Sequence, residues 1–189
     1  MTYKKGFTLV ELLVVIAILA VLATVVVLVL NPAQLLAEAR DSQRISDLGT
    51  IQKALTLYLV NVSTPSMGNT ANCYTHIDVD AAGGGGCAGR HGTKTELSDL
   101  TREVTGGAGW LPVDFGQISS GAPFSVLPID PSNTTTYFYS YTPGANSTFE
   151  LNANMESTKY SSGVTNVEDK DGGSSTTLFE LGSSPGLVI

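Results

Sequence analysis

The sequence predicts an α+β protein in which one long N-terminal helix packs on a small antiparallel β-sheet. Three observations lead to this prediction: an apolar run over 7–30, an amphipathic segment over 32–62, and strand-like alternation over 137–155. Apolar residues spaced three and four apart indicate one face of a helix, whereas strict alternation indicates a half-buried strand. A helical part followed by a run of strands is typical of α+β domains.

The first element is a run from Phe7 to Leu30 in which Glu11 is the only charged residue. Its 24 residues would form a helix of ~36 Å, which spans the about 30 Å hydrocarbon core of a bilayer. Cleaved secretory signals have shorter apolar cores and end at an A-x-A-like site, which this run lacks, so that interpretation is the weaker one. Lys4 and Lys5 precede the run, and the positive-inside rule therefore predicts a cytoplasmic N-terminus with the rest of the chain outside.

The second element runs from Pro32 to about Val62 and continues the apolar run. At the join, either Asn31 caps a new helix with Pro32 at its first position, or Pro32 kinks a continuous helix. We expect one long, locally bent or loosened helix whose outer half packs on the globular part. Its apolar face would consist of Ile45, Leu48, Ile51, Leu55, Tyr58, Leu59 and Val62. The turns between would hold Glu38, Arg40, Asp41, Arg44, Asp47 and Lys53.

Residues 63–189 follow as a globular part of 127 residues, near the usual size of one domain. The stretch from Ser63 to Gly92 is rich in turn residues and predicts a loop. A short helix is expected over Thr95–Val104, with Thr95 as its cap. Its inward-facing residues would be Leu97, Leu100 and Val104.

The strands are expected near the end of the chain. Tyr137–Tyr141 is rich in aromatic residues, and we expect one face of this strand to pack on the helix. A turn over 143–146 leads to a second strand over Thr148–Met155, and a last strand is expected over Thr176–Leu181. These strands would form the antiparallel sheet.

Composition argues against two functional classes. The formal net charge is −7, which repels nucleic acid, so no nucleic-acid partner is expected. The sequence contains no Gly-x-Ser-x-Gly, no phosphate-binding loop and no His-Glu-x-x-His, so we do not expect an enzyme.

The seven residues Lys5-Gly6-Phe7-Thr8-Leu9-Val10-Glu11 resemble the N-terminal signal of type IV pilins and type II secretion pseudopilins. The shared pattern is a short basic leader, Gly, Phe, Ser or Thr, an aliphatic pair and Glu at the fifth mature position. The resemblance covers residues 1–30 strongly and the helix to about Val62 moderately. Over the rest of the chain it is architectural, a pilin-like fold most similar to the major-pseudopilin branch.

This resemblance implies a processing step and an assembly step. A membrane-embedded prepilin peptidase would cut between Gly6 and Phe7, after which the new Phe7 amine would be methylated. The Glu11 carboxylate would then pair with the Phe7 amine of a neighbouring subunit, which offsets the cost of burying a charge. Family members commonly have a proline at the position of Leu28, whereas this chain has Pro32, so the helix break is expected one turn later.

The implied function is that of a structural subunit of a type IV pilus or a type II secretion pseudopilus. Residues 1–6 would be the cleaved leader, 7–30 the transmembrane and later filament-core helix, 31–62 its amphipathic half, and 63–189 the exterior head. The implied partners are further copies in a helical homopolymer, other pilins or pseudopilins, the peptidase, the inner-membrane assembly platform and, before assembly, membrane lipid. The protein would first be a single-pass inner-membrane protein and later part of a filament on the cell surface or in the periplasm.

Two alternatives stay open. In the first, the chain is a minor tip subunit that binds DNA, a surface or secreted cargo. In the second, it is a membrane-anchored exterior domain that never polymerises.

The two cysteines, Cys73 and Cys87, predict a disulfide, because the exterior is an oxidising compartment. A zinc site is the alternative, since His76 and His91 follow the cysteines at plausible ligand spacings. The glycine run between the two pairs is atypical of a zinc module, and the disulfide is the preferred interpretation.

An acidic turn near the C-terminus supplies oxygen ligands at Asp169, Asp171 and Glu180, which makes calcium a candidate ligand. A solvated Asp/Gly turn is the preferred interpretation, and no cofactor is expected. The pattern fails as an EF-hand, because Gly173 and Ser174 occupy the places of a ligand and of the required glycine. The resemblance adds weight to calcium, since some major pseudopilins hold calcium in an acidic loop near the C-terminus.

Overall fold

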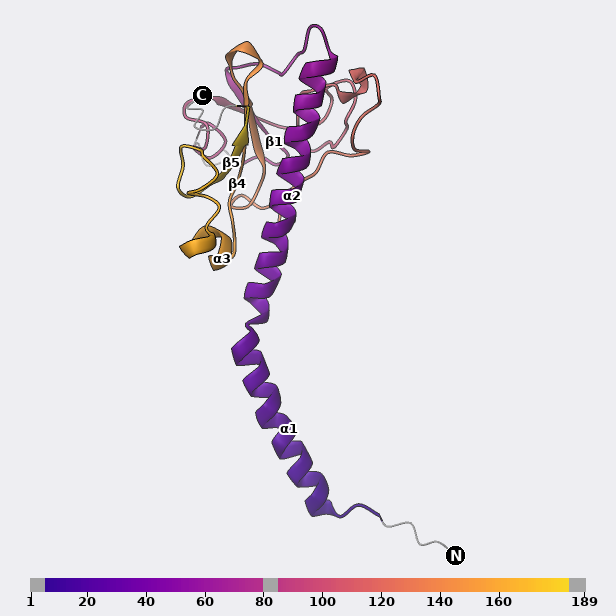
Figure 1. Cartoon of the computed structure of the whole chain (residues 1–189), viewed down its shortest axis with the longest axis vertical. Coiled ribbons are helices and arrows are strands. Elements are labelled where there is room, and N and C mark those ends of the chain that lie inside the picture. Colours follow the sequence, from indigo (N-terminus) through magenta and orange to yellow (C-terminus); the bar gives the residue numbers. More distant parts are fainter. Residues whose placement is uncertain (1–5, 80–84, 184–189) are drawn as a thin grey trace, which may run out of the picture. The chain divides into compact units, whose positions relative to one another are not determined.

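The computed structural model describes residues 6–79 and 85–183. The chain divides into two compact units between Leu36 and Ala37. The first unit contains the apolar helix α1 (Leu9–Leu30), and the second contains the sheet with most of helix α2 (Pro32–Asn61) (Figure 1). The α+β fold class is therefore confirmed.

The break between the two helices lies at Asn31. Its backbone is left-handed, with φ 40° and ψ 75°, which ends α1. The Asn31 carbonyl accepts hydrogen bonds from the backbone N–H groups of Gln34 (3.0 Å) and Leu35 (3.3 Å), and Pro32 takes the first helical position, where no N–H is needed. The long helical stretch to Asn61 is confirmed, and the local loosening expected at the join is a capped break at Asn31.

Helix α2 contributes one side of the core in the second unit. Leu48, Ile51, Leu55 and Tyr58 are fully buried, and Ala54 is nearly so. Ile45, Leu59 and Val62 pack against this core from its edge. The three-four spacing read from the sequence is therefore confirmed as the inward face of the helix.

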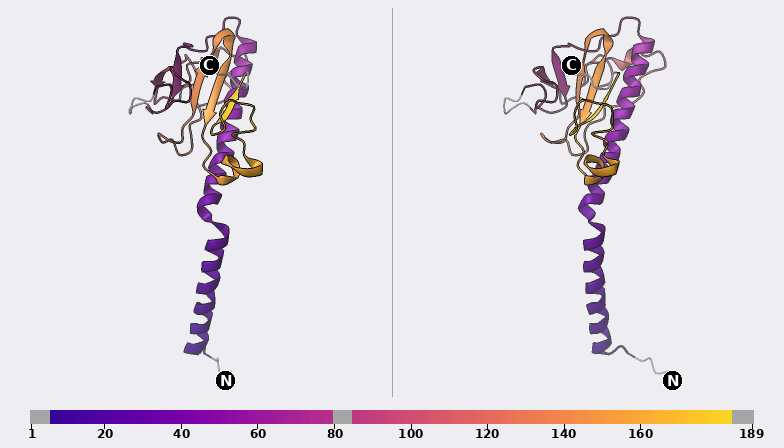
Figure 2. Two further views of the ribbon diagram at one scale, coloured as in Figure 1. Left: turned by 90° about the vertical axis from the view of Figure 1, so that its left-hand side faces the viewer. Right: turned by 60° about the vertical axis from the view of Figure 1, so that its left-hand side comes forward.

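The sheet has five strands in the order β2-β1-β3-β4-β5. Its strands are β1 (Asn72–Thr75), β2 (Thr95–Ser98), β3 (Ser140–Pro143), β4 (Phe149–Ala153) and β5 (Phe179–Gly182). Strands β1 and β2 run parallel, whereas the other neighbours are antiparallel, so the sheet is mixed rather than purely antiparallel. In both views of Figure 2 the strands β3 and β4 lie beside α2.

The core fills the space between α2 and one face of the sheet. Tyr141 and Leu151, which face each other on β3 and β4, are both fully buried there. The irregular segment 110–127 closes the core through Trp110, Leu111, Val113, Phe115 and Leu127. Short helical turns occupy Phe115–Gln117, Ala145–Ser147, Thr158–Ser161 and Gly163–Thr165.

Two predictions before residue 105 are wrong. The expected loop over 63–92 contains β1, and the expected helix over Thr95–Val104 begins instead with strand β2. Backbone pairing with β1 overrides the local helix preference, and Thr95 N–H donates to the Ala71 carbonyl at 3.0 Å. As a result Leu97 and Leu100 are exposed, and only Val104 packs against the core.

The other strands differ from expectation mainly in where they begin. β4 lies within the predicted 148–155 segment, but β3 begins at Ser140 rather than Tyr137. The carbonyls of Thr136 and Phe138 accept hydrogen bonds from Arg90 instead of from a neighbouring strand, which delays the start of β3. β5 likewise begins at Phe179 rather than Thr176.

Candidate processing and assembly site

The start of α1 is closed by a reciprocal pair of contacts between Thr8 and Glu11. The Thr8 hydroxyl accepts a hydrogen bond from the Glu11 backbone N–H at 3.2 Å. In return, Glu11 Oε2 accepts hydrogen bonds from both the Thr8 backbone N–H and the Thr8 hydroxyl, each at 2.8 Å. This arrangement is a capping box, which satisfies amide groups that a helix start leaves without partners.

The capping box gives Glu11 a role that the sequence interpretation missed. The Thr-x-x-Glu spacing before an apolar run is itself the sequence pattern of such a cap, so Thr8 was detectable from the sequence. Both hydrogen bonds that the Glu11 carboxylate accepts go to Oε2, and within residues 6–79 and 85–183 the other oxygen, Oε1, has no hydrogen-bond partner. Glu11 thus retains acceptor capacity for a group outside the chain.

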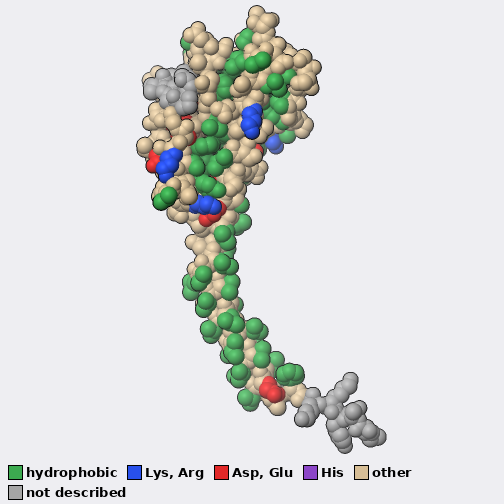
Figure 3. All heavy atoms as spheres, in the orientation of Figure 1, with side chains coloured by type: hydrophobic (Ala, Val, Ile, Leu, Met, Phe, Trp, Pro, Cys, Tyr) green, Lys and Arg blue, Asp and Glu red, His purple; other side chains and the backbone are tan. Residues whose placement is uncertain are grey.

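Helix α1 exposes its whole surface. None of its residues is buried within the chain, and Phe7, just before the helix, is 87% exposed. Figure 3 shows hydrophobic side chains over this segment, with an acidic group near its N-terminal end. The one hydroxyl in its interior, that of Thr24, is satisfied by the Ala20 carbonyl at 2.8 Å. An apolar surface this large requires a membrane or other protein chains to cover it.

In the second unit, Arg44 of α2 is completely buried and uses every donor of its guanidinium. It forms a two-pronged pair with Asp130, with distances of 2.7 Å from Nε and 2.9 Å from Nη2. Nη1 donates to Asp41 at 2.7 Å and to Glu156 at 3.4 Å, and Nη2 also donates to Ser132 at 3.2 Å. The Arg44 cluster therefore joins α2 to two segments that lie far along the chain.

The acidic partners are themselves held by backbone groups. Asp41 accepts hydrogen bonds from the backbone N–H groups of Glu156 and Ser157, and Arg40 pairs with the Glu156 carboxylate. Burial by itself would lower the pKa of Arg44, but hydrogen bonds and charge from Asp130 and Asp41 outweigh burial and raise it. Asp41 and Arg44, expected in the turns between the apolar residues, lie on the buried face of α2.

Cys73 of β1 and Cys87 form a disulfide with a Cα–Cα distance of 6.1 Å. The two histidines of the zinc alternative are occupied elsewhere. His76 Nε2 lies 3.0 Å from the Leu100 carbonyl, and buried His91 Nε2 lies 2.9 Å from the Ser140 hydroxyl. Because both sulfurs are in the disulfide, the structure does not support a zinc site.

The residues predicted to hold calcium are arranged around backbone amides. Asp171 accepts hydrogen bonds from the backbone N–H groups of Gly173 (2.8 Å) and Glu180 (2.6 Å), and Glu180 accepts one from Ser175 N–H at 2.6 Å. Across the described residues, no group of three His, Cys, Asp or Glu side chains has a geometry suited to a metal ion. The set Asp169, Asp171 and Glu180 thus does not fit a calcium ion in this arrangement.

A second polar group, not predicted from the sequence, lies on the sheet face opposite the core. Glu150 of β4 and Glu180 of β5 are both buried there, and His91 Nδ1 lies 3.8 Å from Glu150 Oε1. Burial, together with the neighbouring Glu180, raises the pKa of Glu150 to about 7, although Asn152 and Lys94 oppose the shift. Burial and the adjacent cations lower the pKa of His91 to about 3, so this histidine is neutral at pH 7.

The comparison with protein families agrees with the N-terminal features. Residues 1–27 match the family model described as the prokaryotic N-terminal methylation motif. This motif is the signal of type IV pilins and pseudopilins, and it supports a type IV pilin-like protein, with which the long helix and the sheet agree. The signal and the apolar helix fit a membrane-anchored protein. No curated protein and no solved structure matches the chain.

Proposed function

We propose that this protein is a structural, non-enzymatic subunit of a type IV pilus or a type II secretion pseudopilus, polymerised through α1. The observation that carries the proposal is a methylation motif leading directly into a 22-residue apolar helix with no buried residue. Such a helix serves as a membrane anchor before assembly and as part of the filament core afterwards. Among these subunits, we favour a major pseudopilin.

Processing takes place between Gly6 and Phe7, and the Phe7 amine becomes the methylated N-terminus. Both residues precede α1 and are exposed, which supports access by a prepilin peptidase. The new amine then pairs with Glu11 of a neighbouring subunit, through the carboxylate oxygen that the capping box leaves open. A pair of opposite charges offsets the cost of taking Glu11 into an apolar filament core.

The orientation follows from charge and from the disulfide. Lys4 and Lys5 hold the leader, residues 1–6, in the cytoplasm. Residues 63–189 lie outside, where the Cys73–Cys87 disulfide persists in an oxidising compartment. The proposed partners are other copies of the chain, other pilins or pseudopilins, the peptidase and the inner-membrane assembly platform.

Mass spectrometry of the mature protein tests the processing step. In cells with a working prepilin peptidase, we expect the chain to begin at Phe7 with a methylated amine. A Gly6→Val variant, with a side chain beside the scissile bond, should retain the leader and serve as the control. An unprocessed wild-type chain in these cells would rule the proposal out.

A further inference from the structure

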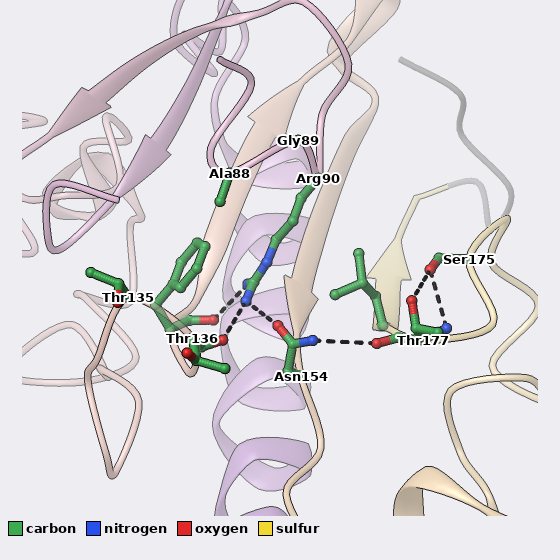
Figure 4. Close-up of a pocket in the computed structure, with 10 residues that line it drawn as sticks. Ala88, Gly89, Arg90, Thr135, Thr136, Asn154, Ser175 and Thr177 are labelled. Carbon is green, nitrogen blue, oxygen red and sulfur yellow. Dashed lines mark hydrogen bonds between the residues drawn. The ribbon is translucent and has the colours of Figure 1, made fainter. Parts of the chain in front are cut away.

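A hollow of about 470 Å³ opens on the second unit and lies outside all the features described above. Its walls come from the loop that ends at Arg90, the segment before β3, the end of β4 and the segment before β5 (Figure 4). This volume lies within the range of ~300–1,000 Å³ that small-molecule sites occupy. The walls are mainly polar, with side chains from Thr135, Thr136, Asn154, Ser175 and Thr177.

The Arg90 guanidinium reaches into this hollow beside Asn154, as Figure 4 shows. Nη1 donates to the Phe138 carbonyl at 2.8 Å, and Nη2 donates to the Thr136 carbonyl at 3.1 Å and to Asn154 Oδ1. The guanidinium carbon lies 3.4 Å from the centroid of the Phe138 ring. All of these partners are neutral, and no carboxylate within the described residues forms an ion pair with Arg90.

The contrast with Arg44 shows what Arg90 lacks. Arg44 is surrounded by the carboxylates of Asp41, Asp130 and Glu156, and the first two raise its pKa. At Arg90, desolvation dominates and lowers the pKa to about 9, and the charge of Asp130 opposes this shift. Arg90 therefore keeps its charge at pH 7, and its side chain is half-buried. Buried charges in proteins are ordinarily paired.

The unused N–H donors of Arg90 and the polar walls of the hollow indicate which chemical groups a ligand would carry. An arginine has five N–H donors, and three are used, which leaves the Nε–H and one Nη1–H. The hydroxyls of Thr135 and Thr136 make no hydrogen bond within the part of the chain that the structure describes. We propose that the hollow binds a small carboxylate that carries several hydroxyl groups, of the uronic-acid type. Its carboxylate faces Arg90, and its hydroxyls meet the threonine and serine side chains.

The proposal does not depend on polymerisation, and a titration of the full-length protein in nonionic detergent tests it. Ligand-observed NMR with D-glucuronate is compared with D-glucose, which has the same ring without the carboxylate. We expect glucuronate to bind at least about tenfold more tightly than glucose, because a charge-assisted pair is lost in the neutral sugar. Inorganic sulfate is the third probe and is expected to bind more weakly than glucuronate, since it lacks the hydroxyl groups.

Two variants separate a ligand role from a structural one. Arg90→Gln should weaken glucuronate binding about tenfold or more, whereas Arg40→Gln, which removes a cation outside the hollow, should leave it unchanged. Because Arg90 also anchors its own loop, Thr135→Tyr provides a second variant that fills the hollow from an exposed position and keeps Arg90. Thr135→Tyr should also abolish glucuronate binding.

Three results would overturn the proposal. They are the absence of glucuronate binding to the wild-type protein, equal affinity for glucose or for sulfate, and undiminished binding in the Thr135→Tyr variant.

Discussion

Arg44 and Asp130 lie 86 residues apart in the chain and form a two-pronged ion pair in which both side chains are fully buried. This pair fixes α2 to the segment that precedes β3, on the same buried face of the helix as Leu48 and Ile51. A buried pair of this kind contributes little when intact, compared with apolar packing, but it is costly to break, because one charge is left without its partner.

We therefore predict that Arg44→Leu destabilises the second unit by about 3 kcal/mol, at the low end for a broken buried pair. The low end applies because Asp130 and Asp41 keep hydrogen bonds from backbone N–H groups. Urea unfolding in detergent, followed by the fluorescence of the single, buried Trp110, measures the change. Arg40→Leu is the matched control and should shift the midpoint much less, since this side chain is 34% exposed. Equal shifts for the two variants would contradict the prediction.

The capping box allows the cap and the charge of Glu11 to be tested separately. Glu11→Gln keeps an oxygen that accepts hydrogen bonds from Thr8 but removes the charge, whereas Glu11→Ala removes both. If Glu11 pairs with a neighbouring amine, both variants should insert in the membrane and both should fail to form filaments. The amount of protein in the sheared filament fraction measures assembly. Normal filaments from Glu11→Gln would show that the cap alone is what assembly needs.

Removing the disulfide should weaken the second unit without changing its fold. The Cys73→Ser/Cys87→Ser double variant loses a cross-link over a sequence separation of 14, which is worth about 3 kcal/mol in the chain-entropy model. Trp110 fluorescence in urea again reports the change. The wild-type protein treated with a reductant is the control and should unfold at the same midpoint as the double variant. An unchanged midpoint in both would contradict the prediction.

The pKa of Glu150 predicts that stability falls as the pH rises toward neutrality. The folded protein holds the Glu150 proton up to about pH 7, whereas the unfolded chain releases it near its ordinary pKa of 4.5. Between these values the folded state binds more protons, so the free energy of unfolding decreases with pH, by up to about 3 kcal/mol. His91, Lys94 and Glu180 face the same group, and the comparison with variants isolates the contribution of Glu150.

Two variants check this assignment by urea unfolding at several pH values. Glu150→Gln should be less sensitive to pH between about 4.5 and 7, because the titrating carboxyl is gone. Glu180→Gln removes the neighbouring acid and should move the pH-sensitive range downward. If the unfolding free energies of both variants depend on pH as in the wild type, the pH dependence arises from other groups.

The parts of the fold that the sequence predicted are those set by local patterns. The spacing of Leu48, Ile51 and Leu55 identified the buried face of α2, and the alternation around Leu151 identified β4. The parallel pairing of β1 with β2 was missed, because it joins residues more than twenty positions apart and neither strand has a strong pattern of its own. Long-range pairing of this kind is not encoded in local periodicity.

The candidate site likewise contains residues that a local sequence pattern identifies and residues that only long-range contacts bring together. Thr8 and Glu11 follow a local capping pattern that the sequence displays. The burial of Asp41 and Arg44, by contrast, depends on Asp130 and on the backbone near Glu156, which lies 115 positions after Asp41. Asp41 and Arg44 continue the three-four spacing of the apolar residues and lie on the same buried face of α2. Charged residues are rarely buried without partners, and the tertiary fold supplies the partners of these two.

The placement of the capping box has a consequence for maturation. Its backbone donor is the amide of Thr8, and the proposed scissile bond between Gly6 and Phe7 lies outside the hydrogen-bonded turn. Thr8 keeps an amide N–H after cleavage, so the same first turn exists in the precursor and in the mature protein. On the proposed processing, removal of the leader would create a new terminal amine and leave the hydrogen bonds of the first turn intact. The cap would be the same before and after cleavage, and only the charge at the chain terminus would change.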